Sequence, residues 1–182
     1  DLEQRRALLR DSSPEIKARA AKFIGDEEYS NRRSVADEWL AKLPETGDAS
    51  AGRAVFEKLC AQCHRAGDLG RNVGPDLTSI SHRSVEDILY NILDPNMAIN
   101  PVYTSYQVET TGGDLLAGNL VAENPQEITL LQANEIKTTV PRKDIVKLRS
   151  TGTSLMPEGL EAGLTPKDMR DLISFLQTGT RE

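Results

Sequence analysis

The run Cys60-Ala61-Gln62-Cys63-His64 constrains this chain more than any other stretch. It contains both cysteines and one of the two histidines of the 182-residue sequence. Two cysteines separated by two residues and followed by a histidine form the pattern of covalent haem attachment. The thiols form thioethers with the haem vinyl groups, and the histidine binds the iron. We therefore predict haem c attached at Cys60 and Cys63, with His64 as the proximal ligand.

The alternative interpretation of the two thiols is a redox-active pair of the thioredoxin type. That motif needs a neighbouring βαβ pattern and has no use for the following histidine. We therefore favour haem attachment, which uses both thiols and leaves none for a disulfide.

Composition and charge limit the partners. Aromatic residues make up only 4% of the chain, which fits a core completed by a large flat cofactor. The net charge of −6 argues against nucleic acid and anionic membrane surfaces. No apolar run reaches the length of a membrane span. Redox partner proteins are the partner class that we expect.

The beginning of the sequence, residues 1–6, has neither an initiator methionine nor the apolar core of a signal peptide. We therefore interpret the sequence as a mature product or an excised fragment. Haem attachment of this kind takes place outside the cytoplasm in bacteria. We expect a periplasmic or otherwise extracytoplasmic location.

Residues 1–46 are expected to form two or three short helices, the tail of a helical-repeat region. Ser13 and Pro14 are typical of a helix start, and apolar residues later recur at helical spacing up to Pro44. We interpret Trp39 as a packing residue of that last helix rather than as a haem-stacking residue.

Three further helices are predicted. The first begins at Asp48 and runs directly into Cys60, with apolar residues at i, i+3, i+4 and i+7. The second covers residues 84–93, and the last begins with a capping box at Thr165. Gly52 would let the first and last of these helices approach closely.

Residues 102–149 change from helical spacing to the alternation that is typical of strands. We expect five short strands, with turns at 112–114 and 123–125 and a single helical turn at 141–144. This pattern predicts a small SH3-like or Sm-like β-barrel, forming an independent module that can be shortened without losing haem ligation. No aromatic platform accompanies its basic residues, so docking or structural cover is expected rather than RNA binding.

Several features follow one another along the chain: Gly52, Phe56, the CAQCH run, Gly74-Pro75-Asp76-Leu77, Met156-Pro157 and a terminal helix. This order resembles class I cytochromes c. The resemblance implies that Gly74 and Pro75 belong to the haem site and that the Pro75 carbonyl accepts a hydrogen bond from Nδ1–H of His64. It also implies that Met156 is the distal iron ligand.

Three runs, NVGPDLTSI, ILDPNMAINPVY and SLMPEGL, are similar to a more specific family. This is the haem-binding domain near the C-termini of large exported planctomycete and verrucomicrobial proteins, and the resemblance covers residues 50–178. Such proteins often carry helical repeats and a dehydrogenase-like region upstream. The resemblance therefore implies a fused or partner dehydrogenase as the electron donor.

Together these patterns predict an α+β chain, mainly a helical class I cytochrome c fold with an inserted β-barrel. Residues 1–46 would be the helical segment and 47–101 the first part of the cytochrome domain. The barrel would occupy 102–149, and the Met loop and last helix 150–182.

The sixth ligand of the iron has competitors. His82 would give a bis-histidine haem, but we interpret it as a loop residue at a helix entrance. Met169 falls within the apolar stripe of the last helix, and Met97 does not match the distal-ligand position of class I cytochromes c. We therefore predict Met156.

Arg71 and Arg83 are candidate partners of the haem propionates, with solvated loop charges as the alternative. The predicted function is single-electron transfer through one haem, without enzymatic catalysis, between a periplasmic donor and an acceptor. Two alternatives stay open. One is a haem enzyme or gas sensor with an open sixth position, and the other is an interaction module with a structural haem.

Overall fold

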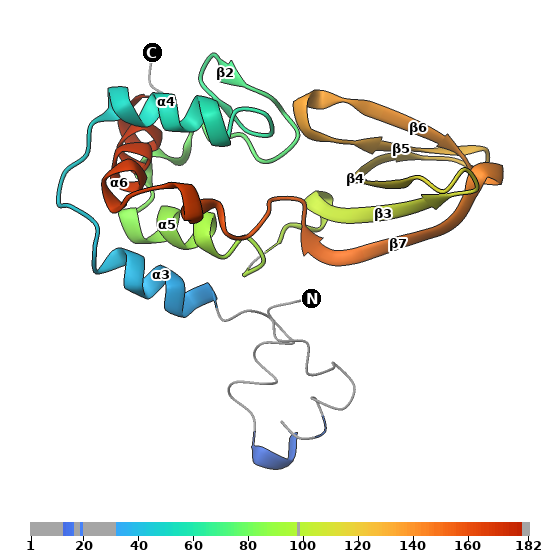
Figure 1. Ribbon diagram of the computed structural model, residues 1–182, viewed down its shortest axis with the longest axis horizontal. Coiled ribbons are helices and arrows are strands. Elements are labelled where there is room, and N and C mark those ends of the chain that lie inside the picture. The colour runs from blue at the N-terminus through green and yellow to red at the C-terminus, as the bar shows by residue number, and fades with distance from the viewer. Residues whose placement is uncertain (1–12, 17–18, 20–31, 98, 180–182) are drawn as a thin grey trace.

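The computed structural model describes residues 13–16, 19, 32–97 and 99–179, and the helices predicted within the remainder of 1–46 lie outside the described residues. Helices gather at one end of the molecule and a β-sheet forms the other (Figure 1). The helices are α3 (Arg32–Leu40), α4 (Ala49–Leu59), α5 (Val85–Leu93) and α6 (Pro166–Ser174).

Helix α4 begins and ends where the sequence predicts. The Asp48 side chain caps it by accepting hydrogen bonds from the N–H groups of Ser50 and Ala51. Cys60 is its C-cap residue, so residues 60–64, which we call the haem-attachment run, follow the helix directly. The close approach to α6 is confirmed, because a Cβ at Gly52 would lie only 1.9 Å from the Asp171 carbonyl oxygen.

The helical core brings together residues from both ends of the chain. The rings of Phe56 on α4 and Phe175 after α6 lie 5.3 Å apart, centroid to centroid. The predicted capping box of α6 is confirmed, since the Thr165 hydroxyl accepts from Asp168 N–H and the Asp168 carboxylate accepts from Thr165 N–H. α6 continues into a π-helical turn over Phe175–Gly179.

A two-stranded ladder of β1 (Arg65–Ala66) and β2 (Leu69–Gly70) follows the haem-attachment run. The main sheet is antiparallel with strand order β6-β5-β4-β3-β7. Its strands are β3 (Thr104–Thr110), β4 (Leu115–Glu123), β5 (Glu127–Leu131), β6 (Lys137–Pro141) and β7 (Ile145–Ser154). The five predicted strands and the helical turn at Arg142–Asp144 are confirmed, and β7 extends beyond its predicted end.

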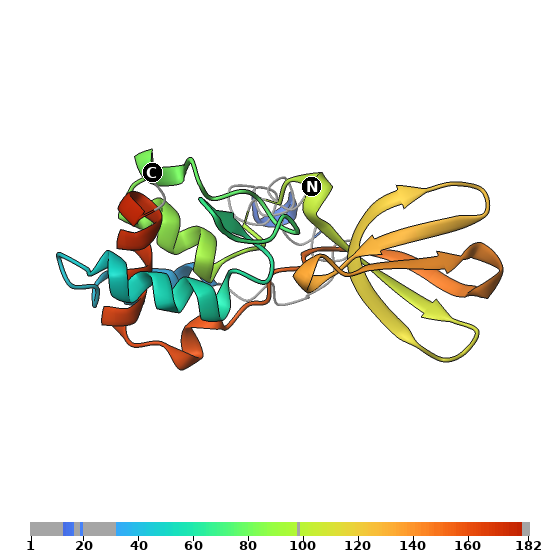
Figure 2. The same cartoon turned by 90° about the horizontal axis from the view of Figure 1, so that it is seen from above.

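The predicted SH3-like or Sm-like barrel is not formed. Throughout residues 104–154, all of which are described, no pairing joins the edge strands β6 and β7, so the sheet stays open. Figure 2 shows its hairpins splayed apart. Alternation identifies strands, but closure depends on strand tilt and stagger, which alternation does not determine.

The sheet has its own core, separate from that of the helices. Val108, Ile128 and Leu130 are fully buried on it, and Val140 is nearly so. Large apolar side chains also stay exposed on the sheet, including Leu115 at 70%. None of the helices in the described ranges has the length and apolar character needed to cross a membrane.

Candidate functional site

The haem-attachment run forms a tight turn at the end of α4. The N–H groups of Cys63 and His64 both donate to the Cys60 carbonyl, at 3.0 and 2.8 Å. Both thiols are free and half-buried. The turn brings Cys60, Cys63 and His64 to the wall of one cavity.

The His64 ring is oriented by a backbone carbonyl. Its Nδ1 lies 2.8 Å from the Pro75 oxygen, as the resemblance to class I cytochromes c implied. A carbonyl oxygen only accepts hydrogen bonds, so Nδ1 carries the ring proton and Nε2 keeps its lone pair for a metal. Gly74 lies against the ring, because a Cβ there would be 2.6 Å from Cε1.

Backbone hydrogen bonds join residues 63–65 to residues 73–77, the segment that contains Gly74 and Pro75. The Cys63 carbonyl accepts from Val73 N–H at 2.9 Å and from Gly74 N–H at 2.7 Å. The Arg65 carbonyl accepts from Leu77 N–H at 2.7 Å. We call residues 60–77 the proximal loop.

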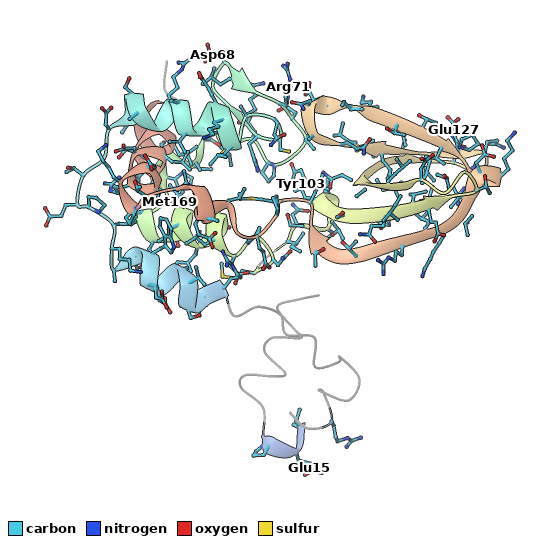
Figure 3. The ribbon with its side chains drawn as sticks, viewed as in Figure 1. Glu15, Asp68, Arg71, Tyr103, Glu127 and Met169 are labelled. Atoms are coloured by element: carbon cyan, nitrogen blue, oxygen red, sulfur yellow. The ribbon has the colours of Figure 1, made fainter. Side chains whose placement is uncertain are left out.

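The cavity has a volume of about 430 Å³ and a mainly apolar lining. Besides the haem-attachment run, its wall includes Leu176 after α6, Tyr103 before β3 and Asn119 on β4. Tyr103 lies where the helices meet the sheet (Figure 3). An apolar cavity beside two thiols and an imidazole whose Nε2 is free to bind a metal fits a covalently held haem.

Burial keeps the side chains of the site neutral. It raises the pKa of the Cys60 thiol to about 12, with a smaller contribution from Cys63, and it also raises the pKa of Cys63. Desolvation lowers the pKa of His64, partly opposed by the hydrogen bond to Pro75. The imidazole is therefore held in the neutral form that binds iron.

Met156 and Arg83, both singled out from the sequence, lie in the cavity wall. Met156 is half-buried, and its N–H donates to the Ser154 hydroxyl at 3.1 Å. Met156 and His64 thus line one cavity although they are 92 positions apart in the sequence.

The competing residues lie elsewhere. Met169 is fully buried in the helical core, and Met97 packs against that core. The His82 ring bonds through Nδ1 to the Ser79 carbonyl at 3.0 Å and does not line the cavity. Arg71 is exposed after β2 and is also absent from the cavity wall.

The loop that carries Met156 is held by side chains that are far from it in the sequence. The Asn96 side chain accepts a hydrogen bond from Ser154 N–H at 2.8 Å and donates one to the Glu158 carboxylate at 2.7 Å. Arg32 on α3 forms an ion pair with Glu161. We call residues 154–164 the Met loop.

Sequence reasoning missed Asn96, Tyr103 and Asn119. Asn119 is 3% exposed and donates through Nδ2 to the Val73 carbonyl at 3.0 Å. A signal was present, because Gly118-Asn119 places two residues that are unfavourable in strands at the middle of β4. The β region therefore contributes to the cavity wall, and its shortening without loss of haem ligation stays a prediction.

Comparison with known families agrees with this geometry. The cytochrome c family model matches residues 49–131, from the start of α4 to the end of β5. No curated protein matches the chain. This part of the chain thus matches a domain that binds covalent haem c with iron, and the match supports an electron-transfer function. The match ends before Met156.

Proposed function

We propose that this domain is a monohaem cytochrome with Cys60 and Cys63 as attachment sites and His64 and Met156 as the axial ligands. It would pass single electrons between an extracytoplasmic donor and an acceptor. One observation carries the proposal. A single apolar cavity is lined by both thiols, by an imidazole with Nδ1 bonded to Pro75, and by the Met156 side chain.

The position of Met156 favours it over the other thioethers. It is half-buried in the cavity wall, whereas Met169 is completely enclosed by helices and Met97 packs on their core. Pro157 follows Met156 and restricts the backbone at that point. Ligation by Met97 or Met169 would therefore require repacking of the helical core.

When bound, the haem supplies a one-electron Fe(III)/Fe(II) couple, which a thioether ligand shifts towards Fe(II). The residues of the chain bind and tune it. Pro75 fixes the tautomer and orientation of His64 and makes the ring a stronger electron donor. Met156 would occupy the sixth position and exclude small molecules from it. Arg83, in the cavity wall, is the candidate partner of a propionate.

The location and partners are also proposals. Covalent haem attachment favours a periplasmic or similar compartment with redox proteins as partners. The three runs quoted above support membership of the planctomycete and verrucomicrobial haem-binding domains. On that basis we propose a fused or partner dehydrogenase as the donor.

The test compares Met156→Ala with Met97→Ala in holoprotein. Met156→Ala should abolish the weak red-end charge-transfer band of oxidised Met-ligated haem, lower the reduction potential and allow CO to bind the reduced protein. Met97→Ala should leave all three unchanged. If Met156→Ala keeps the band, Met156 is not the ligand. Wild-type protein that binds CO readily would favour a sensor or enzyme instead.

Haem attachment has a separate test. Acidified acetone should leave the haem on the polypeptide, because thioethers survive this treatment. Cys60→Ala and Cys63→Ala should each lose most of the covalent haem. Extraction of the haem from wild-type protein would contradict covalent attachment.

A further inference from the structure

We propose that Asn119 of β4 is a positioning residue for His64, so that the β-sheet holds the proximal side of the haem site in place. The inference rests on the proposed role of His64 as an iron ligand. It assigns a function to the β region that neither the motif nor the family match supplies.

The first step is a buried hydrogen bond between the sheet and the proximal loop. Asn119 Nδ2 donates to the Val73 carbonyl at 3.0 Å. The two residues are 3% and 2% exposed, so water does not compete for the bond. A side chain of β4 thus holds a peptide group 46 residues earlier in the chain.

The second step is the identity of that peptide group. The Val73 carbonyl and the Gly74 N–H belong to the same planar unit. Its carbonyl accepts from Asn119, and its N–H donates to the Cys63 carbonyl at 2.7 Å. The peptide is therefore held at both ends, by the sheet on one side and by the haem-attachment turn on the other.

The third step leads to the ring. Gly74 follows this peptide and lies so close to His64 that a Cβ would be 2.6 Å from Cε1. Pro75 comes next, and its oxygen is the 2.8 Å partner of Nδ1. A rotation of the Val73–Gly74 peptide would displace both the surface against which the ring packs and its hydrogen-bond acceptor.

The sheet holds the proximal loop at a second place. In the β5–β6 connection, Asn134 N–H donates at 2.7 Å to the carbonyl of Gln62, one of the two residues between Cys60 and Cys63. The Glu135 carboxylate accepts from Asn72 N–H at 3.0 Å. Asn134 and Glu135 have φ values of 60° and 59°, a conformation that non-glycine residues rarely adopt. The connection is therefore strained where it contacts the loop.

Packing alone does not explain an asparagine at position 119. Its Oδ1 is buried and has no hydrogen-bond partner within the described part of the chain. A buried unpaired acceptor is destabilising, and an apolar side chain of similar shape would avoid it. The bond from Nδ2 to Val73 provides a reason for the amide.

The test uses Asn119→Leu, which keeps the size of the side chain and removes the donor. In reduced holoprotein, the Gly74 amide should exchange its hydrogen faster than in the wild type. In holoprotein, the Nδ1–H NMR signal of His64 should shift. The reduction potential should rise, because a weaker bond to Pro75 makes the ring a poorer electron donor.

The matched control is Gln132→Leu. This residue, which follows β5, also donates its side-chain amide to a backbone carbonyl, that of Ala117 on β4 at 3.1 Å, and accepts from the Thr138 hydroxyl. Neither partner belongs to the proximal loop. The Gln132→Leu variant should leave Gly74 exchange, the Nδ1–H signal and the potential unchanged.

A second variant decides the case if Asn119→Leu fails to fold. Glu135→Ala removes only an exposed contact to Asn72 and should shift the same three readouts in the same directions, by less. The proposal is overturned if the folded variants match the wild type in all three, or if Gln132→Leu shifts them equally. Wild-type protein without haem would contradict the proposed function, whereas unchanged Gly74 exchange in a haem-loaded Asn119→Leu variant would contradict only the sheet contact.

Discussion

The proximal loop and the Met loop lie on the same cavity but are held in different ways. In the proximal loop, most bonds join backbone groups nearby in the chain, as those of Val73 and Gly74 to the Cys63 carbonyl do, and the sheet adds side-chain bonds from Asn119 and Glu135. The Met loop is held mainly by side chains far away in sequence. Asn96 bonds at both sides of Met156, and Arg32 pairs with Glu161.

This difference indicates which substitutions should disturb the proximal loop and which should disturb the Met loop. Backbone bonds persist through most side-chain substitutions but depend on the space that glycine leaves. Side-chain bonds depend on single residues, so one substitution removes every hydrogen bond that this side chain makes to the loop. We therefore expect glycine changes to damage the proximal side and polar changes to release Met156 while the haem stays attached.

The largest effect is expected for Gly74→Ala. The new Cβ would lie 2.6 Å from His64 Cε1, 3.0 Å from Nδ1 and 3.1 Å from Nε2. The ring must move away from Pro75, and such overpacking typically costs about 1–3 kcal/mol. Holoprotein yield, measured as covalent haem per polypeptide, should fall several-fold.

Gly163→Ala is the matched control for this change. Gly163 lies in the Met loop, and a Cβ there would meet nothing within 4 Å. Its holoprotein yield should equal that of the wild type. Equal yields from Gly74→Ala and the wild type would contradict the close fit between Gly74 and the ring.

The second effect is the release of the Met loop by Asn96→Leu. Asn96 is 9% exposed, so the substitution leaves Ser154 N–H without its partner in a poorly hydrated place. We expect a loss of about 1–3 kcal/mol in the free energy of unfolding. Covalent haem should be retained, while the red-end charge-transfer band weakens and CO gains access.

Asn124→Ala serves as its control. Asn124 also accepts backbone N–H groups through its side chain, from Gln126 and Glu127, but in the β4–β5 turn. The absorption spectrum of this variant should be that of the wild type. If Asn96→Leu also keeps the wild-type band and resists CO, Asn96 does not hold Met156 in place.

A smaller effect is expected for Arg32→Met. The Arg32–Glu161 pair is largely buried, with side chains 14% and 12% exposed, and Arg32 also donates to the Leu93 carbonyl at 3.0 Å. Because the pair is not fully buried, we expect a loss of about 1–2 kcal/mol in unfolding free energy. Arg53→Met removes an exposed pair with Glu57 and should change it by less than about 0.5 kcal/mol. Equal losses would mean that α3 does not brace the Met loop.

The features that the sequence predicted correctly depend on residues close together in the chain, and those it missed depend on contacts between distant residues. The attachment turn and the start of α4 were foreseen because their determinants are close in sequence, and the Pro75 bond to His64 was implied by the resemblance to class I cytochromes c. Asn96 and Asn119 were missed, since their partners lie 58 and 46 residues away. Strand alternation identified β3 to β7 but contained no information on closure, so the barrel was expected wrongly.

The smallest effect concerns Asp171, whose carboxylate holds Asp48 at the start of α4. This helix leads at its other end into the haem-attachment run. The Asp171 carboxylate accepts from Asp48 N–H at 2.8 Å and from Lys167 Nζ at 2.6 Å. Although burial opposes ionisation, these bonds keep the pKa of Asp171 below its ordinary 3.8. In acid the unfolded chain therefore binds more protons at this group than the folded protein does. Its stabilisation is complete above about pH 4 and is lost as pH falls through the lowered pKa.

Unfolding of the holoprotein by urea, followed between neutral pH and acid and compared between variants, measures this contribution. Asp171→Asn should lose less stability on acidification than the wild type, because the titrating group is gone. Lys167→Met keeps the Asp48 bond and should fall between the two, since Lys167 is mostly exposed and its pair is weak. Identical acid profiles for the wild type and Asp171→Asn would show that this carboxylate does not anchor α4. In the holoprotein at neutral pH, neither variant should alter the Met-ligation band, because Asp171 bonds to neither loop of the cavity.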